Sequence, residues 1–283
     1  MLIENPRVLT QKEISDISIN FKISKHDFLL LLSNVLNISS SEAFLTKAFS
    51  LSEKEYATIL NYTRRRGKRE PIAKIINKKE FYGIDFKTSK ETLDPRPETE
   101  LVIDLFKKYF PDKNKSMRIL DLGAGTGCLG LTILKLYPNI TADFADISEK
   151  ALNIAKYNAI NLRLIDRCRM IKSDWFSNIK NRYDAILSNP PYVSVRYKLD
   201  KETLYDPEIA LFAGVDGIDA YKKILPKIVS FLNPDSLIFI EIGYDQKEKI
   251  LEINKNLFPV EIKKDLAGVG RVIVFSNSSI ALL

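Results

Sequence analysis

The sequence predicts an α/β fold: a doubly wound, mostly parallel sheet with a small helical domain before it. From about residue 94 onward, short apolar runs alternate with helical patterns, as they do in βαβ units. A glycine-rich turn joins the first of those apolar runs to the helix after it. Before Gly67 there is no glycine, and the pattern there is helical. The length of 283 residues suits two domains of about 150 residues each.

Charge and cysteine content limit the partners and the compartment. A net charge of +7, from 43 basic and 36 acidic residues, permits an acidic or RNA-containing partner without requiring one. Cys128 and Cys168 form neither a disulfide framework nor a metal-ligand spacing, so we expect a reducing compartment and no metal site. The stretch Met1–Pro6 lacks a signal-peptide core, and no apolar run is long enough to span a bilayer. We expect a cytoplasmic protein that needs no membrane.

Residues 1–69 are expected to form the helical domain. Capping residues and apolar spacing predict four helices: Gln11–Phe21, one capped by Ser24, one opened by Ser41 and Glu42, and one opened by the capping box Ser52–Glu55. The last helix ends in the basic cluster Thr63–Arg69, which suits the negative end of a helix dipole. The alternative is that this cluster binds a partner. The single histidine, His26, lies in an apolar helical segment and is assigned no role.

Residues 70–93 are expected to form a β-hairpin linker between the two domains. Two short alternating segments, Ile72–Ile76 and Glu80–Phe86, suggest strands, and Gly83 marks a turn. Residues 94–283 then form the larger domain. It opens with Asp94–Glu100, which leads into an amphipathic helix with Pro97 at a position that suits a first helical turn.

The larger domain is predicted to contain a seven-stranded sheet whose last strand is antiparallel. The expected strands and helices alternate as Met117–Asp121, Gly127–Tyr137, Ile140–Asp146, Ser148–Asn161, Arg167–Ser173, Tyr183–Ser188, Asp216–Leu232, Ser236–Ile242, Asp245–Phe258, Val260–Lys264 and Arg271–Ser276. No helix separates the last two strands, so they should run antiparallel to each other.

A glycine-rich loop at Gly123–Gly127 follows the first strand of this domain. The glycines allow a tight turn and a close approach of a ligand to the backbone. Asp121 ends the strand before the loop, and Asp146 ends the next strand 25 residues later, which suits an acidic ligand of ribose hydroxyls. No phosphate-binding lysine follows the loop, so a Walker-type site is disfavoured. The alternative is a structural turn without a ligand.

The segment Ser188–Tyr192 follows a buried strand and contains two prolines that end it. The carboxyl edge of such a sheet is where ligands bind. Asn189 Oδ1 and the Pro190 carbonyl offer two acceptors, and Tyr192 adds a flat aromatic face. Together they suit a planar, conjugated NH2 group. Singly, Asn189 is also a common turn residue and Tyr192 a common core aromatic.

The glycine loop, Asp146 and the antiparallel final hairpin resemble class I S-adenosylmethionine-dependent methyltransferases. The resemblance implies that residues of the loop face the methionine part of the cofactor, that Asp146 holds the ribose hydroxyls, and that Asp174 and Trp175 flank the adenine. Ile147 is expected to bind the cofactor as well. The loop residues are Gly123, Ala124, Gly125, Thr126 and Gly127. Asn189 is also expected to contact the cofactor. Asp143 is the competing acid for the ribose.

With Asn-Pro-Pro-Tyr in place, the chain resembles the HemK/PrmC family over nearly its whole length. Further matching segments are Arg69–Ala73, Glu80–Gly83, Pro95–Glu100, Ser173–Phe176, Glu208–Gly217, Glu241–Gly243 and Asp265–Gly268. Pro95–Glu100 is the most specific of them, whereas Asn-Pro-Pro-Tyr is shared with adenine-N6 methyltransferases. Gly270 departs from the family, which usually has an acidic or amide residue there.

The family resemblance implies methyl transfer from S-adenosylmethionine to the side-chain amide nitrogen of a glutamine in peptide chain release factors. The product would be S-adenosylhomocysteine, and the glutamine would lie in a Gly-Gly-Gln motif. Asn189 and the Pro190 carbonyl would accept the two amide N–H groups, while Tyr192 packs on the amide plane. The remaining substrate contacts that the resemblance implies are Pro191, Arg96, Thr99 and Glu100. We expect a monomer that requires no nucleic acid and docks its substrate through residues 1–69.

Two other functions fit the same motifs. An adenine-N6 methyltransferase faces the same poorly nucleophilic nitrogen, but it needs a basic groove and a flipped base. Here only Thr63–Arg69 is densely basic. A non-catalytic module that binds the ribosome or another partner is the second alternative. The intact glycine loop, Asp146 and Asn189 argue against it.

Overall fold

The computed structural model describes residues 6–278 and divides the chain into two compact units. One unit contains the residues up to Asn77 together with Asp200–Tyr205, and the other contains Lys78–Leu199 and the residues from Asp206 on. Residues 1–5, on which the signal-peptide expectation rests, and 279–283 lie outside the described part. Among the described residues, no helix combines the length and the apolar character needed to cross a membrane.

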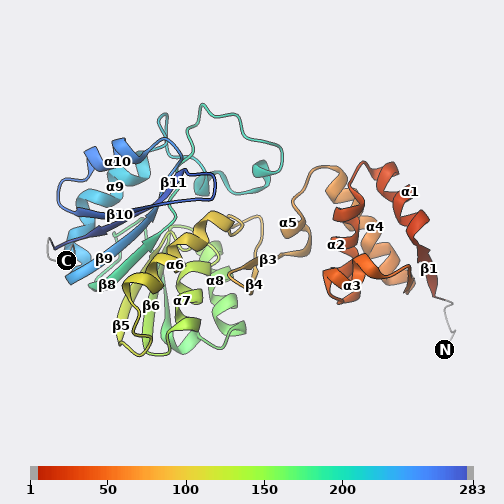
Figure 1. Ribbon diagram of the computed structural model, residues 1–283, viewed down its shortest axis with the longest axis horizontal. Helices are drawn as coiled ribbons and strands as arrows, with labels where there is room; N and C mark the ends of the chain where they lie inside the picture. Colours follow the sequence, from red (N-terminus) through yellow and green to blue (C-terminus); the bar gives the residue numbers. More distant parts are fainter. Residues whose placement is uncertain (1–5, 279–283) are drawn as a thin grey trace. The chain divides into compact units, whose positions relative to one another are not determined.

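The N-terminal unit is helical, as the sequence predicts, and the four expected helices form (Figure 1). Its helices are α1 (Gln11–Phe21), α2 (Lys25–Leu36), α3 (Ser40–Leu45), α4 (Glu53–Gly67) and α5 (Ile72–Ile76). Ser24 caps α2, and Ser52 forms the expected capping box with Glu55 at the start of α4. A two-stranded ribbon, β1 (Arg7–Thr10) and β2 (Ala48–Leu51), was not predicted because each strand has only four residues.

The segment Ile72–Ile76 is a helix, and the prediction that it forms a strand is wrong. Its β-branched residues favour a strand locally, but the Pro71 carbonyl accepts hydrogen bonds from the N–H groups of Lys74 and Ile75 and starts a helical turn. Ile75 is buried in the core of the N-terminal unit. Packing therefore overrides local propensity. The first segment of the unit ends at Asn77, eight residues beyond the expected boundary at residue 69.

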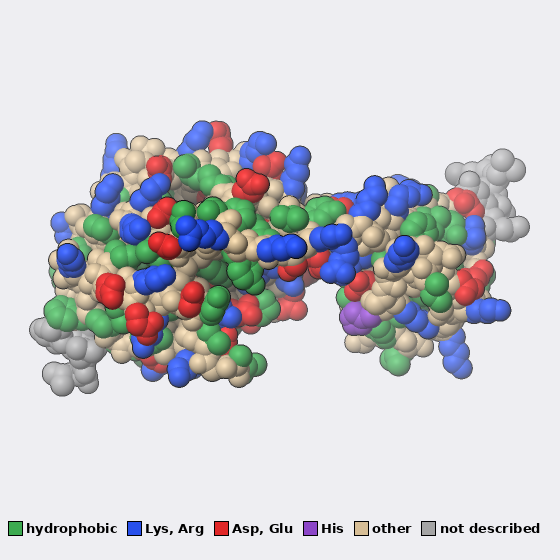
Figure 2. All heavy atoms as spheres, turned by 90° about the horizontal axis from the view of Figure 1, so that it is seen from above, with side chains coloured by type: hydrophobic (Ala, Val, Ile, Leu, Met, Phe, Trp, Pro, Cys, Tyr) green, Lys and Arg blue, Asp and Glu red, His purple; other side chains and the backbone are tan. Residues whose placement is uncertain are grey.

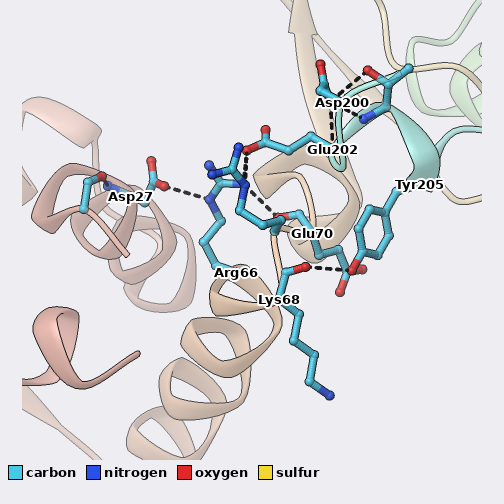
Figure 3. Close-up of polar contacts among 10 residues, drawn as sticks. Asp27, Arg66, Lys68, Glu70, Asp200, Glu202 and Tyr205 are labelled. Atoms are coloured by element: carbon cyan, nitrogen blue, oxygen red, sulfur yellow. Dashed lines mark hydrogen bonds and ion pairs between the residues drawn. The ribbon is translucent and has the colours of Figure 1, made fainter. Parts of the chain in front are cut away.

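The segment Asp200–Tyr205 belongs to the N-terminal unit although it follows the Asn-Pro-Pro-Tyr motif in the chain (Figure 3). The Arg66 guanidinium lies 2.7 Å from Asp27 and 3.0 Å from Glu202, and the Tyr205 hydroxyl donates to the Lys68 carbonyl over 3.2 Å. Arg65 is also paired, with Glu70 at 2.6 Å. Within the cluster Thr63–Arg69, which the sequence offers as an alternative partner-binding site, Arg65 and Arg66 are therefore engaged in ion pairs inside this unit.

Only the second half of the expected linker is a hairpin. β3 (Lys78–Phe81) and β4 (Ile84–Lys87) pair in antiparallel register and belong to the larger unit. The two residues between them, Tyr82 and Gly83, both have positive φ, of 53° and 72°. This is the turn whose twist matches that of the flanking strands, so Gly83 was a correct turn signal.

The larger unit contains a seven-stranded sheet with the order β10-β11-β9-β8-β5-β6-β7. Its strands are β5 (Met117–Leu122), β6 (Ile140–Asp146), β7 (Cys168–Lys172), β8 (Tyr183–Ser188), β9 (Leu232–Glu241), β10 (Phe258–Lys264) and β11 (Gly270–Ser276). β11 is antiparallel to both of its neighbours, while β9, β8, β5, β6 and β7 pair in parallel. The predicted mostly parallel sheet with an antiparallel last strand is confirmed.

Helices cover both faces of this sheet (Figure 1). One face packs against α6 (Glu100–Tyr109), α7 (Cys128–Leu136) and α8 (Glu149–Asn161), and the other against α9 (Asp219–Ile228) and α10 (Lys247–Ile253). Short 3-10 turns occur at Pro97–Thr99, Ile165–Arg167, Thr203–Tyr205, Glu208–Ala210 and Val229–Phe231. Neighbouring strand residues such as Ile119 and Leu120 enter opposite cores, so both faces of the sheet are apolar.

Candidate active site

A cavity of about 380 Å³ opens at the carboxyl ends of β5, β6 and β8. This is within the range of small-molecule sites, and it lies at the edge where open α/β sheets bind ligands. The expected site residues that line it are Arg96, Thr99, Gly123, Ala124, Gly125, Thr126, Asp146, Ile147, Asp174, Trp175, Asn189 and Pro191. The structure therefore brings most of the sequence-predicted residues together in one place.

The glycine loop turns sharply between β5 and α7. Gly123, Gly125 and Gly127 have φ values of 76°, 54° and 77°, a region that side chains with a Cβ rarely enter. The N–H groups of Gly123 and Ala124 both donate to the Ala145 carbonyl, at 2.8 and 3.0 Å. These bonds hold the loop against the end of β6 and leave its backbone along the cavity wall.

Asp146 is held by the backbone at the end of β6. Its two carboxylate oxygens accept hydrogen bonds from the Gly125 N–H at 2.9 Å and the Ser148 N–H at 2.8 Å. Burial raises the pKa of this carboxyl, and the backbone N–H groups oppose that rise. An oriented carboxylate with remaining lone pairs is suited to accept hydrogen bonds from two neighbouring hydroxyls, as a ribose offers.

The competing acid, Asp143, is buried away from the cavity lining. Its carboxylate accepts from the Tyr183 hydroxyl at 2.8 Å and from Asn181 at 3.0 Å, and it lies 3.2 Å from Arg118. These contacts give Asp143 a structural role in the sheet. Of the two acids on β6, Asp146 alone borders the cavity.

Asp121 is a second carboxylate on the cavity wall, and it is almost completely buried. Its Oδ2 accepts from the Gly130 N–H at 2.9 Å. Burial, with the nearby Asp146 charge, raises the pKa of Asp121 to about 7. A cation bound in the cavity would favour the ionised form.

The Asn189 side chain borders the same cavity and is oriented by two other segments. Its Nδ2 donates to Thr99 Oγ1 at 3.1 Å, and the Thr99 hydroxyl donates to Glu241 Oε2 at 2.6 Å. The Tyr192 hydroxyl donates to Glu241 Oε1 at 3.2 Å. The amide of Asn189 is therefore part of a buried hydrogen-bond chain that ends at a carboxylate.

Four expected site residues lie outside the cavity lining. Glu100 accepts a hydrogen bond from the Tyr82 N–H at 2.8 Å, so its carboxylate serves the β3–β4 turn. The Tyr192 hydroxyl donates to Glu241, and Tyr192 does not line the cavity. Pro190 and Gly127 are buried and do not line it either. Arg96 does border the cavity, where it forms an ion pair with the buried carboxylate of Asp206.

Sequence reasoning missed Glu241 and the segment Pro207–Gly214 as parts of the site. Glu241 lies in one of the segments that match the family. Its position as an acid at the end of the apolar run Leu237–Ile240 is the signal in the sequence that points to the site. The Pro207–Gly214 segment contributes Ile209 and Phe212 to the lining. It has no regular pattern from which a position in the fold follows.

Comparison with known proteins agrees with this geometry. The family model described as Methyltransferase small domain matches residues 89–204, and that described as PrmC N-terminal domain matches residues 19–76. Release factor glutamine methyltransferases from Caulobacter vibrioides and Coxiella burnetii are 34% and 36% identical to this chain, covering 88% and 89% of it and 88% and 92% of their own lengths. A methyltransferase structure from Pyrococcus furiosus shares the fold, with a TM-score of 0.52, 17% identity, and coverage of 80% of this chain and 100% of that one.

Proposed function

Because this chain belongs to the release factor glutamine methyltransferase family, we propose that it transfers a methyl group from S-adenosylmethionine to a glutamine side-chain nitrogen in peptide chain release factors. One observation supports this most strongly. The Asn189 amide borders the same cavity as the glycine loop and Asp146. A site for a methyl-accepting NH2 group thus adjoins a site suited to a nucleoside.

The residues present fit the cofactor. The backbone of Gly123–Gly127 would hold its methionine part, Asp146 its ribose hydroxyls, and Asp174 with Trp175 its adenine. The cavity is of a size for such a molecule, and Asp121 places a titratable carboxyl on its wall. Bound S-adenosylmethionine would supply a methyl group on a positively charged sulfur. After transfer of the methyl group, the sulfur is neutral and the product is S-adenosylhomocysteine.

The protein's task is to make a poor nucleophile react. An amide nitrogen shares its lone pair with the carbonyl group, so the site must position it and favour the charge that develops on it. Asn189 Oδ1 would accept one N–H of the substrate. We keep the Pro190 carbonyl as the acceptor of the other; Pro190 is buried outside the cavity lining, so this contact requires its carbonyl to become accessible when substrate binds. Both acceptors stabilise positive charge on nitrogen in the transition state, and the displaced proton passes to water after transfer.

We assign the N-terminal unit to docking of the release factor body. The match to a PrmC N-terminal domain supports this assignment, and so does the exposure of Arg64 and Lys68 at the end of α4. The double variant Arg64→Ala/Lys68→Ala should lower kcat/KM for intact release factor most at low salt, because rim charges act chiefly on association. Turnover of a short glutamine peptide should be unchanged. An equal loss on both substrates would contradict a docking role for these two residues.

Incubation with labelled S-adenosylmethionine and either release factor or nucleic acid tests the function. We expect label on the protein substrate and none on RNA or DNA. On the face drawn in Figure 2, Lys and Arg side chains are scattered among acidic and apolar ones, which does not favour a basic groove there. Label on nucleic acid alone would favour the adenine-N6 alternative. The monomeric state and the cytoplasmic location remain expectations.

A further inference from the structure

The Thr99 hydroxyl lies between Asn189 and Glu241, where the cavity lining meets the interior of the larger unit. Thr99 is 2% exposed and Glu241 is 1% exposed. The Thr99 oxygen is 2.6 Å from Glu241 Oε2 and 3.1 Å from Asn189 Nδ2. Thr99 ends the 3-10 turn that precedes α6, Asn189 directly follows β8, and Glu241 is the last residue of β9. The fold thus assembles a hydrogen-bond chain from three separate segments.

The available protons fix the direction in which donors and acceptors follow one another along this series of hydrogen bonds. An ionised carboxylate only accepts, and a hydroxyl has a single proton to give. Glu241 takes that proton from Thr99 on one oxygen and the Tyr192 proton on the other. The Thr99 oxygen can then only accept, so the group that faces it must be the NH2 end of Asn189. With the amide reversed, two oxygens would face each other with no proton between them.

We propose that Glu241 is a positioning residue for methyl transfer, acting through Thr99 to hold the Asn189 amide with Oδ1 away from Thr99 and available to the substrate. The inference deepens the proposed function and rests on it. A reversed Asn189 would present an N–H donor to the substrate NH2 group, where an acceptor is needed. Orientation of Asn189 therefore decides whether the amide site exists at all.

The charge state of Glu241 controls this orientation. Burial raises its pKa to about 7, and the charge of Glu98 adds to the rise, while hydrogen bonds from Thr99 and Tyr192 and the charge of Arg271 oppose it. The other titratable groups around it are Tyr221, which donates to its main-chain carbonyl at 3.0 Å, and Cys128. Burial raises the pKa of both of these, so they stay neutral near pH 7.

A protonated Glu241 can donate a hydrogen bond to Thr99. The Thr99 hydroxyl is then free to donate to Asn189, and the orientation of the Asn189 amide is no longer fixed. At saturating cofactor and release factor, kcat should therefore rise with pH through about 7 and level off above it. Saturation keeps the titration of groups that act on cofactor binding out of this profile. A role of Glu241 in stability alone would not produce a titration of kcat in the folded, cofactor-bound enzyme.

Variants of Thr99 separate the hydroxyl from the shape of the side chain. Thr99→Val should lower kcat by roughly 10- to 100-fold, as expected for loss of a preorganised polar contact, and its remaining activity should not change between pH 6 and 8. Thr99→Ser, which keeps the hydroxyl, should stay within about threefold of wild type. Thr132→Val is the matched control, because the Thr132 hydroxyl is buried without a partner among the described residues. It should behave as wild type.

Glu241→Gln provides a second variant, in which the side-chain amide can donate to Thr99. It should lower kcat by roughly 10-fold or more and abolish the rise of kcat through pH 7, with the Kd for S-adenosylmethionine within about twofold of wild type. If Thr99→Val keeps wild-type turnover, or Thr99→Ser falls as far as Thr99→Val, the positioning role is wrong. If the wild-type enzyme itself methylates no release factor, the proposed function fails instead.

Discussion

The Asp146 carboxylate accepts a hydrogen bond from the backbone N–H of Gly125 at 2.9 Å, joining the end of β6 to the loop that follows β5. One contact thereby fixes both the acid and the turn that would surround a nucleoside. The backbone N–H of Ser148 holds the other carboxylate oxygen. Removal of this carboxylate takes away hydrogen-bond acceptors without changing the apolar cores of the sheet.

We predict that Asp146→Ala weakens S-adenosylmethionine binding by about 1.5–3 kcal/mol, the range for hydrogen bonds to a charged group. Calorimetric titration of the two proteins measures this difference. Asp143→Asn is the control on the same strand, since Asp143 does not line the cavity. It should leave the Kd nearly unchanged. A normal Kd for Asp146→Ala would move the ribose contact to another group.

Asn189→Ala is expected to reduce kcat by roughly 100- to 1,000-fold while leaving most of the cofactor affinity intact. The reason is that Ala offers no acceptor to the substrate NH2 group. Methyl transfer to release factor at saturating substrate measures kcat, and calorimetry measures the Kd of the cofactor. Turnover at the wild-type rate would show that Asn189 is not part of the amide site.

Binding of the positively charged cofactor should tighten by about tenfold between pH 6 and 8. In the free protein, burial raises the pKa of Asp121 to about 7, so one unit below that value only about one carboxyl in ten is ionised. A bound cation favours the ionised form and lowers this pKa, so affinity increases as pH rises through 7. Titrations of wild type and Asp121→Asn test the idea. The variant should show a much flatter profile, and an identical profile would assign the titration to another group.

The ion pairs of Arg66 should stabilise the N-terminal unit. Arg66→Ala removes hydrogen-bonded contacts to Asp27 and Glu202 in a partly buried setting, so it should lower the free energy of unfolding by about 1.5–3 kcal/mol. Arg64→Ala is the matched control, because Arg64 is exposed two positions earlier on the same helix, and it should change stability by less than about 0.5 kcal/mol. Urea unfolding measures both, and equal effects would contradict the structural role of Arg66.

Local rules account for the parts of the fold that the sequence predicts well. The caps at Ser24 and Ser52 and the glycine loop are short patterns whose partners lie within a few residues. The prediction failed at Ile72–Ile76, where burial of Ile75 decided the conformation against local propensity. Similarly, β9 begins at Leu232 rather than at the expected Ser236, because Leu232 pairs with Tyr183 on the neighbouring strand.

The sequence predicts those residues of the candidate site that lie at the end of a single strand. Asp146 ends a buried strand and Asn189 follows one, and parallel strand ends meet at one edge of a sheet. Contacts between distant segments could not be derived in this way. Thr99 lies 90 residues from Asn189 and 142 from Glu241, and no local pattern indicates that their side chains meet. For the same reason, no local pattern indicates that the Glu100 carboxylate accepts a hydrogen bond from the Tyr82 N–H.

Mass spectrometry of release factor after incubation with S-adenosylmethionine and this protein tests directly whether a glutamine side chain is methylated. We predict one added methyl group, located by fragmentation on the side-chain nitrogen of a single glutamine. It should be present with the wild-type enzyme and with Thr132→Val, and nearly absent with Asn189→Ala over the same time. A methyl group on another residue type, or equal methylation by the Asn189→Ala variant, would show that Asn189 does not present a glutamine amide for methyl transfer.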